Sequence, residues 1–120
     1  MKALFDTNIL IDYLNGIPAA KRELDLYEGH AVSIITWMEV MIGGEPELAD
    51  TTRGFLNGFT SIPLNDGIAE RALRLRRERN LKLSDAIIFA TAIESGLILV
   101  TRNAKDFGGK LPGVRHPYRV

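Results

Sequence analysis

The chain has 120 residues, of which 46% are hydrophobic and 25% charged, the proportions of an ordinary globular domain. It contains no cysteine and only two histidines, His30 and His116, which excludes disulfides, iron–sulfur clusters, thiol catalysis and a histidine-rich metal site. Fifteen basic residues balance fifteen acidic ones, so no net field attracts nucleic acid or a membrane. No apolar run approaches the ~20 residues of a membrane span, and Asp6 follows too early for a signal peptide. We therefore expect one soluble, cytoplasmic domain over residues 1–120, without membrane association.

Strand and helix patterns alternate along the sequence. The first half is expected to contain a strand over Lys2–Phe5, helices over Ile9–Leu14 and Ala19–Tyr27, a strand over Ala31–Ile35, a helix capped by Thr36 that continues through Met41, and a helix over Glu45–Leu56. The second half is expected to contain a strand over Ser61–Leu64, a helix over Asp66–Arg79, a helix over Asp85–Ser95 capped by Ser84, a strand over Leu97–Val100 and a short edge strand over Val114–Pro117. This alternation predicts an α/β fold in which helices cover both faces of a mostly parallel sheet.

Acidic residues follow the predicted strands. Asp6, Glu39 and Asp106 each come within a few residues of a strand end, and Asp85 opens a helix whose next eight residues carry no charge. Ligands of parallel α/β sheets bind beyond the carboxyl ends of the strands, so we expect these four carboxylates to share one crevice. Such a cluster repels itself unless a cation is bound. Oxygen ligands select magnesium, or manganese, before zinc, which indicates metal-assisted phosphoryl chemistry.

Each acidic residue also has a simpler interpretation. Asp6 could only cap a helix, Asp85 could only complement a helix dipole, and Glu39 could point outward from an amphipathic helix. Asp106 could be an ordinary turn residue. The repeated position of the acids relative to the strands favours the site. The five arginines between Arg71 and Arg79 could likewise form a solvated face or a ridge that grips phosphates.

Four segments carry motifs in a fixed order: Phe5–Ile11, Ser33–Val40, Leu83–Ala92 and Leu99–Phe107. Together they resemble the PIN-domain family, and most closely its VapC-type toxin branch. The resemblance implies a PIN-like three-layer α/β/α sandwich and a magnesium-dependent ribonuclease. It also implies that the protein is the toxin of a type II toxin–antitoxin pair, with a protein antitoxin as partner, and a homodimer.

The resemblance also assigns residues. It implies that Asp6, Glu39, Asp85 and Asp106 form the catalytic and metal-binding set, with Thr7 and Asn103 as supporting polar groups. Many relatives carry Asp at the position of Asn103, which leaves a second metal position open. For contacts to the RNA backbone we expect Arg102, Arg74 and Arg77.

The hypothesis is therefore hydrolysis of an RNA phosphodiester, leaving 5′-phosphate and 3′-hydroxyl ends. A phosphoacceptor receiver domain would need adjacent acids after the first strand, but Thr7 follows Asp6. A haloacid-dehalogenase-type phosphatase would need an Asp at the position of Asn8. The remaining alternative is a catalytically weak or inactive PIN-like protein that binds RNA or an antitoxin. Apolar side chains in Leu10–Leu14 and Phe55–Phe59 predict a groove for an antitoxin helix or a dimer patch.

Overall fold

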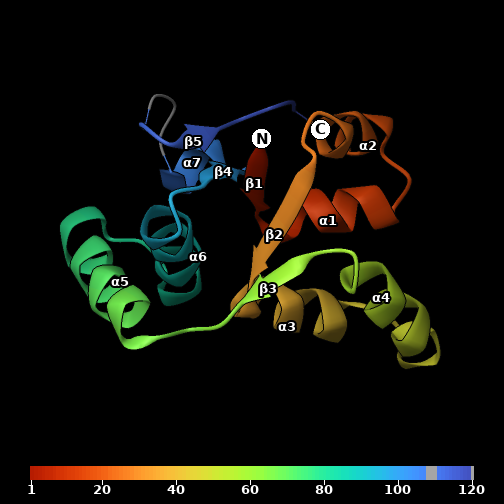
Figure 1. Cartoon of the computed structure of the whole chain (residues 1–120), viewed down its shortest axis with the longest axis horizontal. Coiled ribbons are helices and arrows are strands. Elements are labelled where there is room, and N and C mark those ends of the chain that lie inside the picture. Colours follow the sequence, from red (N-terminus) through yellow and green to blue (C-terminus); the bar gives the residue numbers. More distant parts are fainter. Residues whose placement is uncertain (108–110, 120) are drawn as a thin grey trace.

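The computed structural model describes residues 1–107 and 111–119 (Figure 1). The strands are β1 (Lys2–Phe5), β2 (Gly29–Ser33), β3 (Thr60–Ile62), β4 (Ile98–Val100) and β5 (Val114–Arg115). The helices are α1 (Thr7–Leu14), α2 (Pro18–Asp25), α3 (Ile34–Gly43), the 3-10 helix η1 (Pro46–Leu48), α4 (Ala49–Leu56), α5 (Asp66–Arg79), α6 (Leu83–Glu94) and α7 (Ala104–Phe107). Within these residues, no helix is long and apolar enough to cross a membrane.

The strands form one five-stranded sheet in the order β3-β2-β1-β4-β5, and every pairing is parallel. At its centre, Leu4 of β1 pairs with Ala31 of β2 on one side and with Leu99 of β4 on the other. The chain order therefore switches direction at β1, between β2 and β4. In open parallel sheets, the carboxyl edge at such a switch point is where ligands bind. The predicted α/β fold with a parallel sheet is confirmed.

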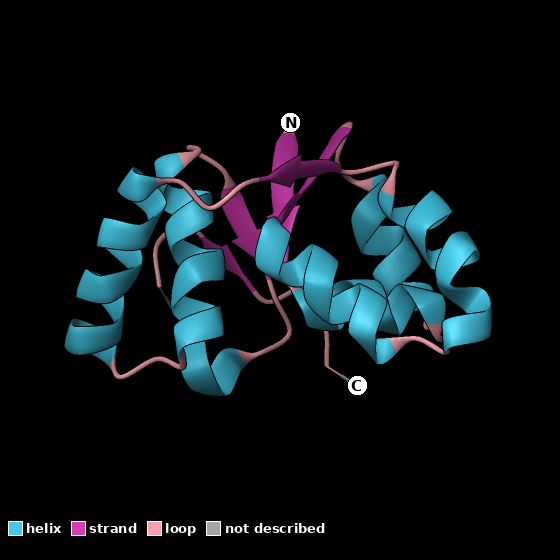
Figure 2. Cartoon of the chain, turned by 90° about the horizontal axis from the view of Figure 1, so that it is seen from below, coloured by secondary structure: helices cyan, strands magenta, loops and turns pink. Residues whose placement is uncertain are grey.

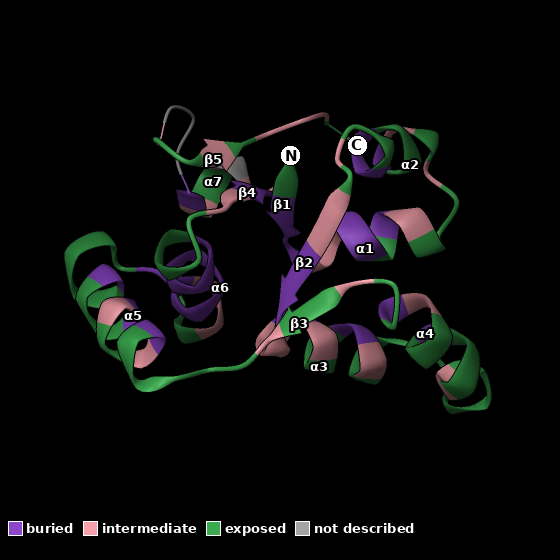
Figure 3. Ribbon diagram, in the orientation of Figure 1, coloured by how far each residue is buried: buried purple, intermediate pink, exposed green. Residues whose placement is uncertain are grey.

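Helices cover both faces of the sheet (Figure 2), and neighbouring strand residues contribute to opposite layers. One core combines sheet residues such as Leu4 and Leu99 with α5 and α6. The other combines Phe5 and Val100 with residues of α1, α2, α3 and α4. Figure 3 shows the buried residues concentrated in the central strands and on the inward faces of the helices. This arrangement is the expected α/β/α sandwich.

Two of the predicted helix caps are wrong. Ser33, not Thr36, is the N-cap of α3, and its hydroxyl accepts a hydrogen bond from the Ile35 N–H at 3.1 Å. Thr36 lies inside the helix and is fully buried. Helix α6 begins at Leu83, so Ser84 is already helical and Lys82 is the N-cap without a side-chain hydrogen bond. The sequence alone does not decide which of several neighbouring residues begins a helix, and helix ends are commonly displaced by one or two residues.

Other predicted boundaries also change. The single helix expected over Glu45–Leu56 is divided into η1 and α4. Helix α7 occupies a segment to which the sequence analysis assigned no helix or strand. Strands β3 and β5 end earlier than expected, at Ile62 and Arg115. Proline lacks the N–H that a strand ladder requires, which explains why β3 stops before Pro63.

Candidate active site

Asp6 lies directly after β1, at the carboxyl edge of the sheet. It is 4% exposed, and its carboxylate accepts hydrogen bonds from the Thr7 N–H at 2.8 Å, the Thr101 hydroxyl at 2.7 Å and the Asn8 amide at 3.3 Å. The first of these bonds caps α1, so Asp6 is a helix cap, as its simpler interpretation predicts. Burial nevertheless raises the pKa of Asp6 above its ordinary value, because loss of hydration outweighs the donated bonds.

Glu39 lies near the middle of α3, which packs beside α1. Its side chain is exposed, as the outward-pointing interpretation anticipated. The Thr7 hydroxyl donates to Glu39 Oε1 at 2.6 Å and lies 3.2 Å from the Thr36 hydroxyl. The Glu39 charge also contributes to the raised pKa of Asp6. Thr7 therefore ties Glu39 to the same sheet edge as Asp6.

Asp85 lies in the first turn of α6 and Asp106 in α7. Burial, the charge of Asp6 and a hydrogen bond shared with Asp106 raise the pKa of Asp85 from its ordinary 3.8 to about 6. The Asn103 amide donates to Asp106 Oδ2 at 2.8 Å, and the Asp106 N–H donates to Asn103 Oδ1 at 3.3 Å. The bond from Asn103 is the main reason why the pKa of Asp106 lies below its ordinary value. At this position, Asn103 supplies a donor that an aspartate could not supply.

The four carboxylates form a chain of electrostatic contacts. The charge of Glu39 helps to raise the pKa of Asp6, and the charge of Asp6 helps to raise the pKa of Asp85, which shares a hydrogen bond with Asp106. The fold thus gathers all four predicted acids at one edge of the sheet. In the described part of the chain, however, no three acidic or histidine side chains form a cluster that could hold a metal ion. The donor chemistry fits a hard cation, because every donor is oxygen and two of the carboxylates have raised pKa values that a cation would lower.

Comparison with known proteins agrees with this geometry. The family model of the PIN domain matches residues 3–108. The chain belongs to the PIN-domain family. It is 32% identical to the tRNA(fMet)-specific endonuclease VapC of Shigella flexneri, with 89% of this chain and 90% of that protein covered. It is 31% identical to Ribonuclease VapC1 of Methanocaldococcus jannaschii, with 88% of this chain and 79% of that protein covered.

A solved structure supports the same family assignment. A toxin–antitoxin complex from Klebsiella pneumoniae contains a chain that is 50% identical to this one and superposes with a TM-score of 0.94, covering 98% of this chain and 99% of that one. The PIN domain described here is therefore of the VapC type, and the resemblance seen in the sequence motifs is confirmed.

The arginines expected to contact RNA lie in two different settings in this PIN domain. Arg74 and Arg77 are exposed on α5. Arg102 donates through two nitrogens to the buried Asp12, at 2.7 and 3.1 Å. An RNA phosphate would have to displace this bidentate ion pair to reach the Arg102 guanidinium.

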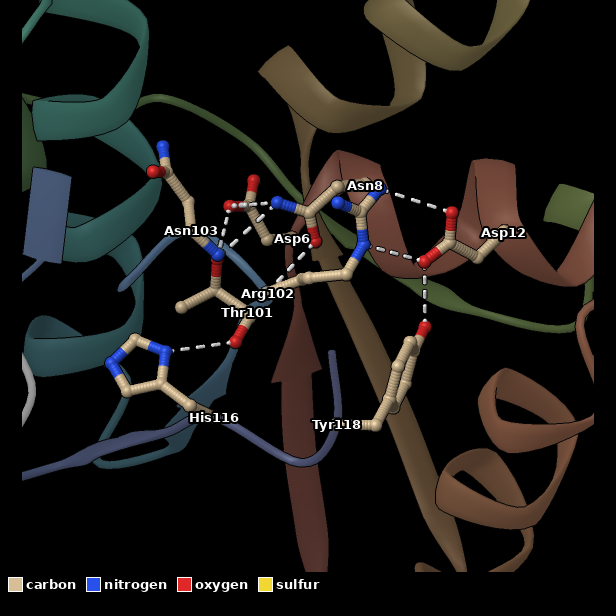
Figure 4. Close-up of polar contacts among 8 residues, drawn as sticks. All are labelled: Asp6, Asn8, Asp12, Thr101, Arg102, Asn103, His116 and Tyr118. Atoms are coloured by element: carbon tan, nitrogen blue, oxygen red, sulfur yellow. Dashed lines mark hydrogen bonds and ion pairs between the residues drawn. The ribbon is translucent and has the colours of Figure 1, made fainter. Parts of the chain in front are cut away.

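Sequence reasoning missed the two side-chain donors that hold the Asp6 carboxylate, Thr101 and Asn8. Thr101 is fully buried and follows β4 just as Asp6 follows the adjacent β1, but as a single residue it resembles any strand end. Asn8 accepts a hydrogen bond from the Arg102 N–H at 3.1 Å while its amide nitrogen donates to Asp6 (Figure 4). Each residue lies one or two positions from an acid or a strand end, and this position was the signal that could have identified it. In a single sequence, however, such a residue cannot be distinguished from an ordinary turn residue.

Proposed function

We propose that this VapC-type PIN domain is a metal-dependent endoribonuclease and the toxin of a toxin–antitoxin pair. The observation that carries the proposal is the electrostatic coupling of Asp6, Glu39, Asp85 and Asp106 at the switch point of a parallel sheet. The relatives in Shigella flexneri and Methanocaldococcus jannaschii are named as an endonuclease and a ribonuclease. An RNA substrate would place the protein in the cytoplasm.

The cofactor of the proposed reaction is Mg²⁺, with Mn²⁺ as a substitute. Asp6, Glu39 and Asp85 would hold the ion, directly or through water, and Asp106 would complete the acidic site. When bound, the cation would activate water and neutralise the charge that develops on the phosphate. Its binding requires ionisation of Asp85, whose pKa of about 6 opposes the charged form below neutral pH.

The protein's own groups orient the reactants. Thr101 and Asn8 direct the Asp6 carboxylate, and Thr7 directs Glu39. Asn103 holds Asp106, which would orient the attacking water. Water adds to phosphorus in line with the departing 3′ oxygen, and that oxygen takes up a proton, so that the products carry 5′-phosphate and 3′-hydroxyl ends. Arg74 and Arg77 remain the candidates for backbone contacts on α5, since Asp12 engages Arg102.

The test is cleavage of RNA by the purified protein with Mg²⁺, with excess chelator, and by Asp85→Asn. Asp66→Asn is the matched control, because Asp66 also lies in the first turn of a helix but is exposed on α5. We expect cleavage by the native chain and by Asp66→Asn, and a loss of at least about a hundredfold in Asp85→Asn and in chelator. Activity of Asp85→Asn equal to that of the native chain would contradict the proposed site. Tight RNA binding without any cleavage would favour the alternative of a catalytically inactive PIN-like protein.

The proposed antitoxin would bind beside this site. A cavity of about 480 Å³ lies between α1, α3 and α4, and its walls include Ile11, Leu14, Val40, Gly43, Leu48 and Phe55. Ile11 lies one turn after Thr7 on α1 and Gly43 one turn after Glu39 on α3, so the groove continues from the acidic side chains. An antitoxin helix laid there could send a basic side chain to the carboxylates. Of the two segments expected to line the groove, Leu10–Leu14 contributes Ile11 and Leu14, whereas from Phe55–Phe59 only Phe55 lines it.

The antitoxin of the Klebsiella pneumoniae complex is a suitable probe, because one chain of that complex is 50% identical to this one. We expect it to bind this protein and inhibit cleavage, and we expect Leu14→Glu to weaken binding at least about tenfold while RNA cleavage persists. Leu26→Glu is the control, since Leu26 is 64% exposed after α2 and lies outside the groove. Equal binding by both variants would contradict the groove as the docking surface.

We also propose a homodimer. Met38 and Ile42 lie one turn apart on α3 and are 47% and 81% exposed, an apolar stripe of the kind that marks contact surfaces. Light scattering should give twice the chain mass of 13.3 kDa, and Ile42→Glu should halve it. A native protein that scatters as a monomer at micromolar concentration would contradict the dimer.

A further inference from the structure

A buried ion pair lies outside the proposed catalytic set. Asp12 of α1 is 5% exposed, and its carboxylate accepts hydrogen bonds from Arg102 Nε at 2.7 Å, Arg102 Nη2 at 3.1 Å and the Tyr118 hydroxyl at 2.8 Å (Figure 4). Burial and the bond to Asp12 raise the pKa of Tyr118, so its phenol stays protonated and donates. Asp12 thus joins α1 to the segment after β4 and to the C-terminal segment of the chain.

The backbone of Arg102 leads from this ion pair to the active site. Its N–H donates to Asn8 Oδ1 at 3.1 Å. With its oxygen held in this way, the Asn8 amide turns its nitrogen toward Asp6 Oδ2, at 3.3 Å, and toward the Thr101 hydroxyl, at 3.4 Å. The Thr101 hydroxyl donates to the same Asp6 oxygen at 2.7 Å. The Asn8 donor on Asp6 Oδ2 is therefore set by where the Arg102 backbone lies, and Thr101, the second donor, directly precedes Arg102 in the chain.

We propose that Asp12 and Arg102 are positioning residues that fix the direction of the Asp6 carboxylate through Asn8 and Thr101. The inference rests on the proposed nuclease function for its catalytic consequence. Asp12 anchors the Arg102 side chain, and the planar, bidentate geometry of that ion pair defines the backbone position more sharply than a single contact would. Because Asp6 is placed at the reacting centre, a shift in its direction would lower kcat more than it raises KM.

The chain provides a matched control for this network. Glu23 of α2 is 4% exposed and accepts hydrogen bonds from Arg115 Nε at 2.6 Å, Arg115 Nη2 at 3.0 Å and the Tyr27 hydroxyl at 3.1 Å. Both networks thus pair a buried carboxylate with a bidentate arginine and a tyrosine. Among the described residues, the hydrogen bonds of the Arg115 side chain go to Glu23 and not to Asp6 or Asn8. The Arg115 carbonyl accepts the Thr101 N–H at 3.0 Å, a backbone bond that does not depend on the side chain.

The experiment compares Arg102→Lys with Arg115→Lys, and Tyr118→Phe with Tyr27→Phe, in thermal unfolding and in kcat and KM for RNA cleavage with Mg²⁺. Each lysine keeps the charge and loses the bidentate geometry, so the two Arg→Lys variants should lose similar stability. At a temperature at which all variants are folded, we expect Arg102→Lys to lower kcat about tenfold to a hundredfold with KM within about twofold. Arg115→Lys should keep kcat within about twofold, and Tyr118→Phe should lower it more than Tyr27→Phe. Equal kcat losses in the two arginine variants, or no loss in either, would overturn the proposal.

A second readout does not depend on cleavage. The side-chain amide of Asn8 gives a pair of signals in a proton–nitrogen correlation spectrum, and we expect these signals to shift or broaden in Arg102→Lys but not in Arg115→Lys. If the native protein fails to cleave any RNA, the proposed function fails while this spectrum still tests the positioning. Unchanged Asn8 signals in Arg102→Lys would contradict the network itself.

Discussion

Asp6 combines two roles that sequence reasoning treats as alternatives. One oxygen of its carboxylate accepts the Thr7 N–H and caps α1, while the other accepts the Thr101 hydroxyl and the Asn8 amide. A carboxylate has about four acceptor positions, so capping leaves room for a further ligand. The cap also fixes the side chain, since it restricts Asp6 at the point where β1 becomes α1.

Thr101→Val should reveal how strongly Asp6 depends on its buried donor. Valine keeps the shape of the side chain but removes the 2.7 Å hydrogen bond, leaving a 4% exposed carboxylate with weaker partners. We expect a loss of about 1.5–3 kcal/mol in the free energy of unfolding at pH 7, measured by urea denaturation. Thr101→Ser retains the hydroxyl and should lose less than half as much. Equal losses in the two variants would mean that the lost methyl or altered packing, not the hydrogen bond, sets the stability.

Asp85 should make the protein less stable as pH rises. Its pKa is raised from 3.8 to about 6, so the folded state binds the proton more tightly than the unfolded state does. The stability that protonation provides is present below about pH 4 and is lost as pH rises through 6. A shift of about two pKa units corresponds to about 3 kcal/mol. Asp85 is partly exposed to solvent, which screens the interaction, so we expect about 1–2 kcal/mol.

Asp85→Asn removes this penalty. In chelator, the variant should melt about 4–8 °C above the native chain at pH 7.5 and within about 2 °C of it at pH 4. Asp66→Asn, which changes an exposed acid in an equivalent helical position, should show no such dependence on pH. A difference in melting temperature between Asp85→Asn and the native chain that stays constant across this pH range would contradict the raised pKa of Asp85.

At the scale of the element, the start of α3 places Glu39. Ser33 is the last residue of β2 and the N-cap of α3, so the strand passes into the helix without a loop. Because Ser33 fixes where α3 begins, it also fixes the helical face on which Glu39 meets Thr7. The sequence predicted a strand that ended two residues later, at Ile35, and a cap at Thr36, which would have shifted the expected start of the helix.

Ser33→Ala tests this assignment of the cap. Losing the hydrogen bond to the Ile35 N–H should cost about 1 kcal/mol of stability in chemical denaturation. Ser84→Ala should change stability by no more than about 0.5 kcal/mol, because Ser84 lies within α6 and does not cap it. A loss of about 1 kcal/mol at Ser84 would instead support the cap that the sequence suggested.

At the scale of the whole molecule, the sheet separates two cores. Ile9 and Ile68 are both fully or almost fully buried, but Ile9 belongs to the layer of α1 and Ile68 to the layer of α5. Ile9→Val and Ile68→Val should each cost about 0.5–1.5 kcal/mol, and the double variant should equal their sum within about 0.5 kcal/mol. Ile68→Val with Ile88→Val changes one layer twice and should deviate further from additivity. Strong coupling between Ile9 and Ile68 would contradict two independent layers.

Much of the architecture could be predicted because the hydrophobic pattern of a short segment indicates whether that segment forms a strand or a helix. The apolar run Lys2–Phe5 was assigned as a strand with both bounds correct, and the five-arginine helix Asp66–Arg79 likewise. Helix caps and the division of Glu45–Leu56 could not be predicted, since each depends on which of several acceptable local conformations packs best. The position of Glu39 could be predicted only in part. Its helix was expected, whereas its exposure and its hydrogen bond to Thr7 depend on how α1 lies against α3.

The sequence by itself determined the α/β class and the four candidate carboxylates, because periodicity and strand ends are properties of short segments, and its motifs carried the resemblance to the PIN-domain family. Only the tertiary structure decided which side chains hold those carboxylates. The Thr101–Asp6 bond joins residues 95 positions apart, and the Arg102–Asp12 pair joins residues 90 apart. Both contacts follow from the parallel register of β1 against β4, and no local pattern specifies a register between strands that are so distant in the chain.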